Sequence, residues 1–186
     1  MANPITPEFR VSYPNVFTPK MNTLSKKEEY SIVALFPKGA DLSKLEAVAR
    51  EAIEEKWGPD KAKWPKNMKT PFRLQDDKEK DGVMPAGHEK GLVFMNLKSK
   101  QRPGLVDRKR QPIIDSSEFY AGCYAIASVS CYAYDEAGNR GVAFGLVNLQ
   151  KTREGEPLSG RPKAETEFQA IAGDEPQAKT AGDLFG

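Results

Sequence analysis

The chain has 186 residues, 39% of them apolar and 29% charged, so it has the composition of a folded protein with room for one domain and a tail. It lacks the apolar run of ~18 to 20 residues needed to span a bilayer, and its N-terminus lacks a secretory signal, so we expect a cytoplasmic protein without a membrane partner. The net charge of +2 is uneven, because residues 164–186 carry −4 and residues 1–163 carry +6. A basic body with an acidic tail is typical of proteins that bind polyanions.

The first third of the chain predicts two strands and a helix. FRVSYPNVF, residues 9–17, starts with alternating apolar side chains but contains Pro14, so we expect a strand that stops there and runs into a loop. A second, buried strand is expected over residues 30–36. Asp41 then occupies a position suited to an N-cap, and the helical spacing of apolar residues over 42–57 predicts an amphipathic helix.

Two basic segments follow, separated by a strand. Residues 58–90 are rich in lysine and proline and show no periodicity; a loop of this length is unusual unless it has a function, so the segment is a candidate binding element. Residues 91–98 predict a strand. Beyond it, bases surround a turn at residues 103–104: Lys98, Lys100, Arg102, Arg108, Lys109 and Arg110.

Residues 122–151 carry the clearest strand pattern. Every second residue from Cys123 to Ala133 is small and apolar, which predicts a face turned to the core. Residues 135–139 predict a hairpin turn, after which a partner strand continues through Phe144. The face opposite the small residues carries rings and hydroxyls, namely Tyr124, Ser128, Ser130, Tyr132 and Tyr134.

The order of these elements favours a mainly β fold. Strands do not alternate with helices, which excludes a doubly wound sheet, and five or six short strands with one helix favour a small barrel. We therefore expect a five-stranded antiparallel OB-fold barrel with one amphipathic helix, long loops and a C-terminal tail. Residues 1–163 would form the barrel domain, and residues 164–186 an acidic, flexible tail.

The sequence offers no catalytic or metal-binding motif. His88 is the chain's one histidine and is expected to be a solvated loop residue, so Ser/His/Asp catalysis has no support. The acids over residues 76–81 alternate with lysines, as in a solvated charge run. Cys123 and Cys131 lie on one strand too far apart to form a disulfide. We expect no enzyme activity, no metal and no cofactor.

Two features favour nucleic-acid binding. The bases between Lys98 and Arg110 could neutralise phosphates with release of counterions, although a charged loop also serves solubility alone. Tyr124, Tyr132 and Tyr134 could stack on bases, although tyrosine is also a good strand former whose ring can pack under a helix or loop. Either feature alone leaves both interpretations open.

Several long runs resemble a known family. RVSYPNVFTPK, EEYSIVALFPKG, KSKQRPGLVD, FYAGCYAIASVSCYAYD and GNRGVAFGLVNLQKTREGEPLSGR are similar, in this order and over about residues 9–163, to single-stranded DNA-binding proteins of tailed phages. The resemblance implies an OB-fold that binds and protects single-stranded DNA without sequence preference during replication or recombination. By position, it implies that Lys98, Lys100 and Arg102 follow the DNA backbone. It offers Tyr132, Tyr134 and Phe144 as rings that either stack on bases or fill the core.

The C-terminus, TAGDLFG, contains Asp183 followed by Leu184 and Phe185. The resemblance implies a mobile acidic tail with an aromatic tip, which competes with DNA and docks replication or recombination proteins. The alternative is a frayed terminus in which Phe185 is incidental.

Other functions remain open at this level. The same barrel could be a protein-interaction or structural module, or a nuclease with carboxylates that hold a divalent metal. RNA could replace DNA, because stacking and backbone contacts do not read the sugar. The sequence leaves the oligomeric state open, with a dimer among the alternatives.

Overall fold

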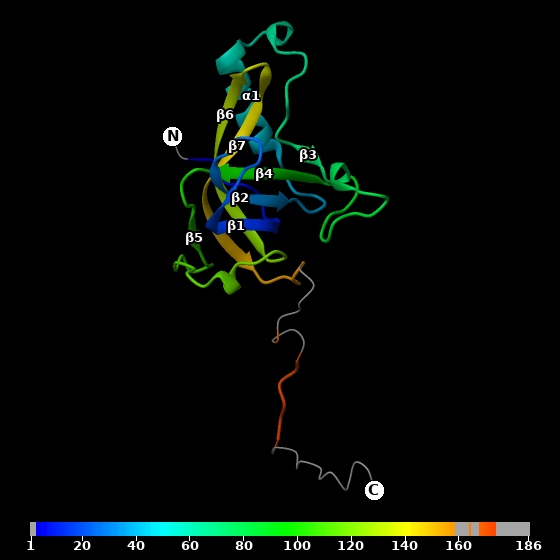
Figure 1. Cartoon of the computed structure of the whole chain (residues 1–186), viewed down its shortest axis with the longest axis vertical. Helices are drawn as coiled ribbons and strands as arrows, with labels where there is room; N and C mark the ends of the chain where they lie inside the picture. The colour runs from blue at the N-terminus through cyan, green and yellow to red at the C-terminus, as the bar shows by residue number, and fades with distance from the viewer. Residues whose placement is uncertain (1–2, 159–163, 165–167, 174–186) are drawn as a thin grey trace.

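The computed structural model describes residues 3–158, 164 and 168–173 (Figure 1). Within these residues the chain forms one α-helix, α1 (Ser43–Trp57), and short 3₁₀ turns at Lys61–Lys63, Gln75–Lys78 and Ser116–Glu118. The strands of the described residues are β1 (Phe9–Met21), β2 (Glu28–Leu35), β3 (Arg73–Leu74), β4 (Val93–Ser99), β5 (Gly104–Val106), β6 (Tyr124–Glu136) and β7 (Asn139–Arg153).

Five of these strands close into a ring. The sheet order is β3-β4-β2-β1-β6-β7-β5, and a further pairing of Lys98 on β4 with Gly145 on β7 joins β4 to β7. A small barrel in which β1 pairs with both β2 and β6 is the OB-fold arrangement, so the predicted mainly β fold is confirmed. Two details of the prediction were wrong. The described sheet has seven strands, because β3 and β5 extend its edges, and β7 pairs in parallel with β4 and β5.

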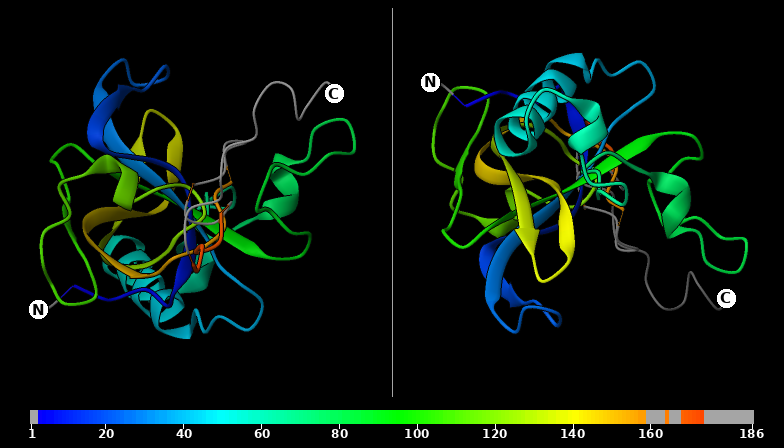
Figure 2. Two further views of the ribbon diagram at one scale, coloured as in Figure 1. Left: turned by 90° about the horizontal axis from the view of Figure 1, so that it is seen from below. Right: turned by 90° about the horizontal axis from the view of Figure 1, so that it is seen from above.

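The barrel is filled from the inward faces of its strands. The alternation predicted for β6 is confirmed, since Cys123, Ala125 and Val129 are fully buried. Cys123 and Cys131 are free thiols. Figure 2 shows α1 beside the β6–β7 hairpin, and Leu45 is its most deeply buried residue. No helix of the described residues is both long and apolar enough to cross a membrane.

The helix agrees with the sequence except at its start. Leu42 occupies the N-cap position without a side-chain hydrogen bond. Asp41, which was expected at the N-cap, lies one residue before it. Its carboxylate accepts hydrogen bonds from the backbone N–H and the hydroxyl of Ser43. These bonds lower the pKa of Asp41. The helix ends at Gly58, whose φ of +88° glycine adopts without strain.

Pro14 does not end the first strand. β1 runs on to Met21 with a register shift between Ser12 and Asn15, and Tyr13 within that shift has a φ of +44°. An extra residue in one strand interrupts the ladder locally, so the missing N–H of proline is tolerated there. The sequence prediction failed because it treated Pro14 as a stop.

The segment over residues 58–90 is tied to the barrel. The buried side chain of Gln75 donates to the carbonyl oxygens of Phe36 and Val93 and accepts from the backbone N–H of Glu89. His88, expected in solvent, is 7% exposed, and its ring lies against Phe94. A buried amide that satisfies three backbone groups holds this segment against the end of β4.

Candidate nucleic-acid interface

A large hollow lies where the β6–β7 hairpin meets β4 and residues 68–74. Backbone hydrogen bonds between Lys69 and both Arg140 and Val142 attach this segment to the hairpin. The space has a volume of about 850 Å³, and we call it the tyrosine hollow. It is lined by Met68, Lys69, Thr70, Pro71, Phe72, Arg73, Leu74, Asp77, Asn96, Lys98, Tyr132, Tyr134, Val142, Ala143 and Phe144.

Two tyrosine rings occupy the β6 wall of the tyrosine hollow. Tyr132 is 51% exposed, and its ring centroid lies 6.5 Å from that of the half-buried Tyr134. Partial burial raises the pKa of Tyr132, and the charge of Glu29 acts in the same direction. The phenol therefore stays neutral at physiological pH, and its ring is available for stacking.

Phe144 belongs to the core. It is 2% exposed, and its ring packs edge-on against Phe72 with centroids 5.9 Å apart. The sequence left stacking and core roles open for this ring; the structure gives it the core role, because β7 turns it inward beneath the hollow.

Cations line the hollow and continue past it. Lys98 is exposed at the end of β4, with its Nζ 4.0 Å from a carboxylate oxygen of Glu29. Lys100 is exposed just beyond the strand. The Arg102 guanidinium lies 6.0 Å from the ring centroid of Phe17 on β1. The bases predicted to follow a backbone thus lead from the tyrosine hollow toward the β1–β2 hairpin.

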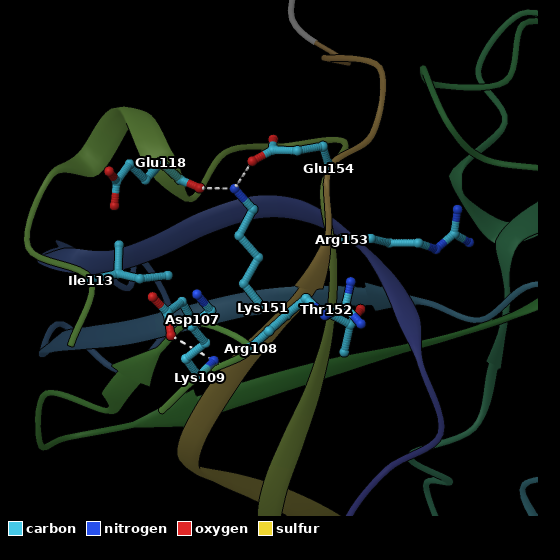
Figure 3. Close-up of a pocket in the computed structure, with 9 residues that line it drawn as sticks. All are labelled: Asp107, Arg108, Lys109, Ile113, Glu118, Lys151, Thr152, Arg153 and Glu154. Atoms are coloured by element: carbon cyan, nitrogen blue, oxygen red, sulfur yellow. Dashed lines mark hydrogen bonds and ion pairs between the residues drawn. The ribbon is translucent and has the colours of Figure 1, made fainter. Parts of the chain in front are cut away.

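A second hollow lies at the far end of β7 and has a volume of about 520 Å³ (Figure 3). We call it the basic hollow, because Arg108, Lys109, Lys151 and Arg153 contribute to its wall. Arg110 is exposed in the adjoining turn, with a φ of +64°. The predicted bases therefore divide between two places, since Arg108, Lys109 and Arg110 lie at the end of β7 opposite the tyrosine hollow.

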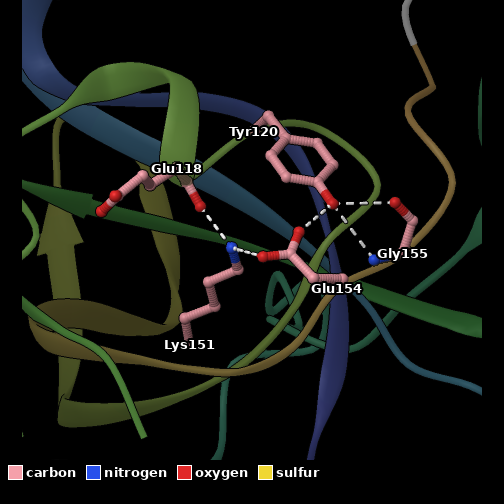
Figure 4. A network of polar contacts seen from close by, with 5 residues as sticks. All are labelled: Glu118, Tyr120, Lys151, Glu154 and Gly155. Atoms are coloured by element: carbon pink, nitrogen blue, oxygen red, sulfur yellow. Dashed lines mark hydrogen bonds and ion pairs between the residues drawn. The ribbon is translucent and has the colours of Figure 1, made fainter. Parts of the chain in front are cut away.

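Internal contacts engage part of the basic hollow's charge. Lys151 Nζ donates to the carbonyl oxygen of Glu118 and pairs with the carboxylate of Glu154 (Figure 4). The Tyr120 hydroxyl contacts Glu154 and Gly155. Burial, with the Glu154 hydrogen bond, raises the pKa of Tyr120 to about 12. This network fixes the end of β7 and engages the buried Lys151, whereas Arg108 and Lys109 are exposed.

Tyr124 does not share a surface with the other two tyrosines. It lies at the opposite end of β6, where the Arg153 guanidinium is 3.6 Å from its ring centroid and that of Arg10 is 5.9 Å away. Arg153 is held there by Glu8, at 3.1 Å. A guanidinium already stacked on the ring takes the place that a base would need.

Residues 2–180 match the model of a family described as the single-stranded DNA-binding protein of Enterobacter phage Enc34. The chain belongs to this family. A curated relative, p50 of Acyrthosiphon pisum secondary endosymbiont phage 1, is 29% identical over 167 residues, which cover 85% of this chain and 87% of p50. The Enc34 family consists of binding proteins, in agreement with the expectation that the chain is not an enzyme.

Solved structures share the fold. The Enc34 protein in complex with single-stranded DNA aligns with a TM-score of 0.65 and 18% identity, over 83% of this chain and 88% of that one. The single-stranded DNA-binding protein gp2.5 of bacteriophage T7 aligns with a TM-score of 0.57 and 13% identity, over 95% of this chain and 97% of that one. These alignments support the OB-fold, and the family match over residues 2–180 confirms the resemblance inferred from the sequence.

Sequence reasoning did not single out two cations of the tyrosine hollow. Lys69 and Arg73 line the tyrosine hollow together with Tyr132. Both residues belong to the lysine-rich segment over residues 58–90, which the sequence marked as a candidate binding element without indicating which of its residues would bind. In the described part of the chain, no cluster of three or more histidine, cysteine or acidic side chains could hold a metal ion. The predicted tail site of Asp183, Leu184 and Phe185 lies outside the described residues.

Proposed function

We propose that the chain binds single-stranded DNA without sequence preference through the tyrosine hollow. The observation that carries this proposal is the half-exposed ring of Tyr132 beside Tyr134, on a hollow that also presents Lys69, Arg73 and Lys98. Stacking on aromatic rings accepts every base, because each base has a π-face, and cations beside the rings neutralise phosphates.

The same arrangement disfavours duplex DNA. In a duplex the base faces are hidden within the stack, so rings on the wall of a hollow reach them only after strand separation. A structural module built on the same barrel would have no use for exposed rings with cations on either side. DNA is preferred to RNA here because the family is one of DNA-binding proteins.

Replacing Lys98, Lys100 and Arg102 together by alanine should weaken binding and flatten its salt dependence. Each phosphate contact on a single strand contributes about 0.7 to the slope of log K against log salt, so losing three contacts lowers that slope by about 2. Fluorescence anisotropy of labelled oligo-dT at several salt concentrations measures it. The matched control replaces Lys44, Arg50 and Lys56, which are exposed on α1, and keeps the slope. An unchanged slope in the first variant would place the phosphate contacts elsewhere.

The remainder of the proposal rests on sequence. Residues 164–186 form an acidic tail whose Asp183, Leu184 and Phe185 dock replication or recombination proteins and compete with DNA for the basic barrel of residues 1–163. The protein acts in the cytoplasm of the host cell, where phage DNA is copied.

A further inference from the structure

A third hollow lies on the outer face of the barrel, between the strands β1 and β2 and the segment over residues 78–88. Its volume is about 440 Å³, and we call it the His88 hollow. Its wall includes Tyr13, Val33, Lys78, Lys80 and His88. None of these residues was singled out as a DNA contact by the sequence, and none lines the tyrosine hollow.

The His88 hollow adjoins the tyrosine hollow across the face of β2 and β4. Val33 in the first is paired with Asn96, which lines the second. Phe94, which alternates with the core residue Met95, points outward from β4 yet has no exposed surface. Arg73 of the tyrosine hollow and Lys78 of the His88 hollow both lie over its ring, at 5.0 and 5.4 Å. A single strand of DNA that leaves one hollow can therefore reach the other by crossing adjacent residues of β2 and β4.

His88 lines the hollow and has one buried ring nitrogen without a hydrogen-bond partner. Its Nδ1 lies 3.2 Å from the carbonyl oxygen of Ala86; because a carbonyl only accepts, Nδ1 carries the proton. In the neutral ring Nε2 is then an acceptor. Nε2 is buried and has no hydrogen-bond partner among the described residues. A buried polar atom left unpaired is destabilising, so a ligand that donates to Nε2 removes that cost and binds more tightly.

Tyr13 supplies an aromatic ring to the same hollow. It is 60% exposed, and its φ of +44° is unusual for a bulky side chain. The register shift in β1 at this residue interrupts the regular alternation, and the ring lines the hollow. Lys78 and Lys80 bring positive charge to the opposite wall. Ring, acceptor and cations together match a nucleotide, which offers a π-face, N–H donors and a phosphate.

We propose that the His88 hollow binds one nucleotide at the end of the DNA path that starts in the tyrosine hollow. The base packs against Tyr13 with its pairing edge toward His88, where a shift of the imidazole out of its buried position exposes Nε2 to an N–H of the base, and the flanking phosphates contact Lys78 and Lys80. This proposal rests on the function proposed above. It extends the DNA path beyond the tyrosines of β6.

The single histidine of the chain makes a direct test possible. Full-length protein labelled with ¹⁵N-histidine shows the two ring-nitrogen signals of a single imidazole. They are followed while a dT oligonucleotide of about 16 residues is added, with anisotropy recorded on the same samples. We expect the Nε2 resonance to shift along the anisotropy isotherm, as it would if thymine N3–H donated to it.

The matched variant is Tyr13→Gly. Glycine adopts a φ of +44° without strain, so this substitution removes the ring and keeps the backbone. It should weaken oligo-dT binding about fivefold or more and abolish the His88 shift. Phe168→Ala, which removes another exposed ring, should change neither.

The outcomes separate the two proposals. If anisotropy reports DNA binding but the His88 resonance does not change, the His88 subsite is wrong. The same holds if Tyr13→Gly binds with unchanged affinity. Either result would leave the proposed binding in the tyrosine hollow in place. A wild-type chain that shows no anisotropy change with oligo-dT would overturn the proposed function, and the subsite with it.

Discussion

Replacing Phe144 by alanine should lower the free energy of unfolding by about 3 to 5 kcal/mol. The ring is 2% exposed and packs edge-on against Phe72, so its removal leaves a cavity beneath the tyrosine hollow. In a domain of this size each kcal/mol shifts Tm by about 2 to 4 °C, which predicts a drop of roughly 6 to 20 °C in a thermal melt.

The outcome decides which of two roles this ring has. Phe144→Leu keeps most of the apolar volume and should lose much less stability than the alanine variant. If Phe144→Ala melted near the wild-type temperature but bound oligo-dT far more weakly, the ring would be a stacking surface and its assignment to the core would be wrong.

Replacing Tyr132 by alanine should weaken oligo-dT binding by about 1 to 3 kcal/mol, or roughly 5- to 150-fold. The ring is 51% exposed beside Tyr134, so it can offer a face to a base without first leaving the core. Because so much of the side chain is in solvent, the substitution should change Tm much less than Phe144→Ala does. Anisotropy titrations at one fixed salt concentration measure the affinity.

Two further variants isolate stacking as the cause. Tyr132→Phe removes the hydroxyl, keeps the ring and should bind nearly as well as the wild type. Tyr124→Phe, at the other end of β6 where Arg153 covers the ring, should also leave affinity unchanged. If Tyr132→Ala bound oligo-dT with wild-type affinity, the bases would have to stack on a surface other than this tyrosine.

The β6–β7 segment shows what sequence alone predicts well. The period of two from Cys123 to Ala133 fixed which side chains are inward, since a strand with one buried face has no other register. The turn predicted over residues 135–139 is also confirmed, since Ala137 and Gly138 adopt the positive φ that a two-residue hairpin turn requires. Both predictions depended only on residues close together in the sequence.

Tyr124 and His88 show where that reasoning ends. Alternation put Tyr124 on the same face as Tyr132, but the guanidinium that covers it comes from Arg153 on another strand. His88 stands in a polar loop sequence, yet its ring is buried and lies against Phe94 on β4. The first position depends on an arginine from the paired strand and the second on how the loop folds back onto β4, and neither contact leaves a periodic signal in the sequence.

The most direct test compares a labelled oligo-dT with a duplex of the same length by fluorescence anisotropy, from low to moderate salt. The full chain should bind the single strand tightly, lose affinity as salt rises and bind the duplex much more weakly. A chain shortened to end at Gly173 should bind the single strand more tightly, because the acidic tail no longer competes. Equal affinity for duplex and single strand, or no binding by either chain, would contradict a function based on stacking in the tyrosine hollow.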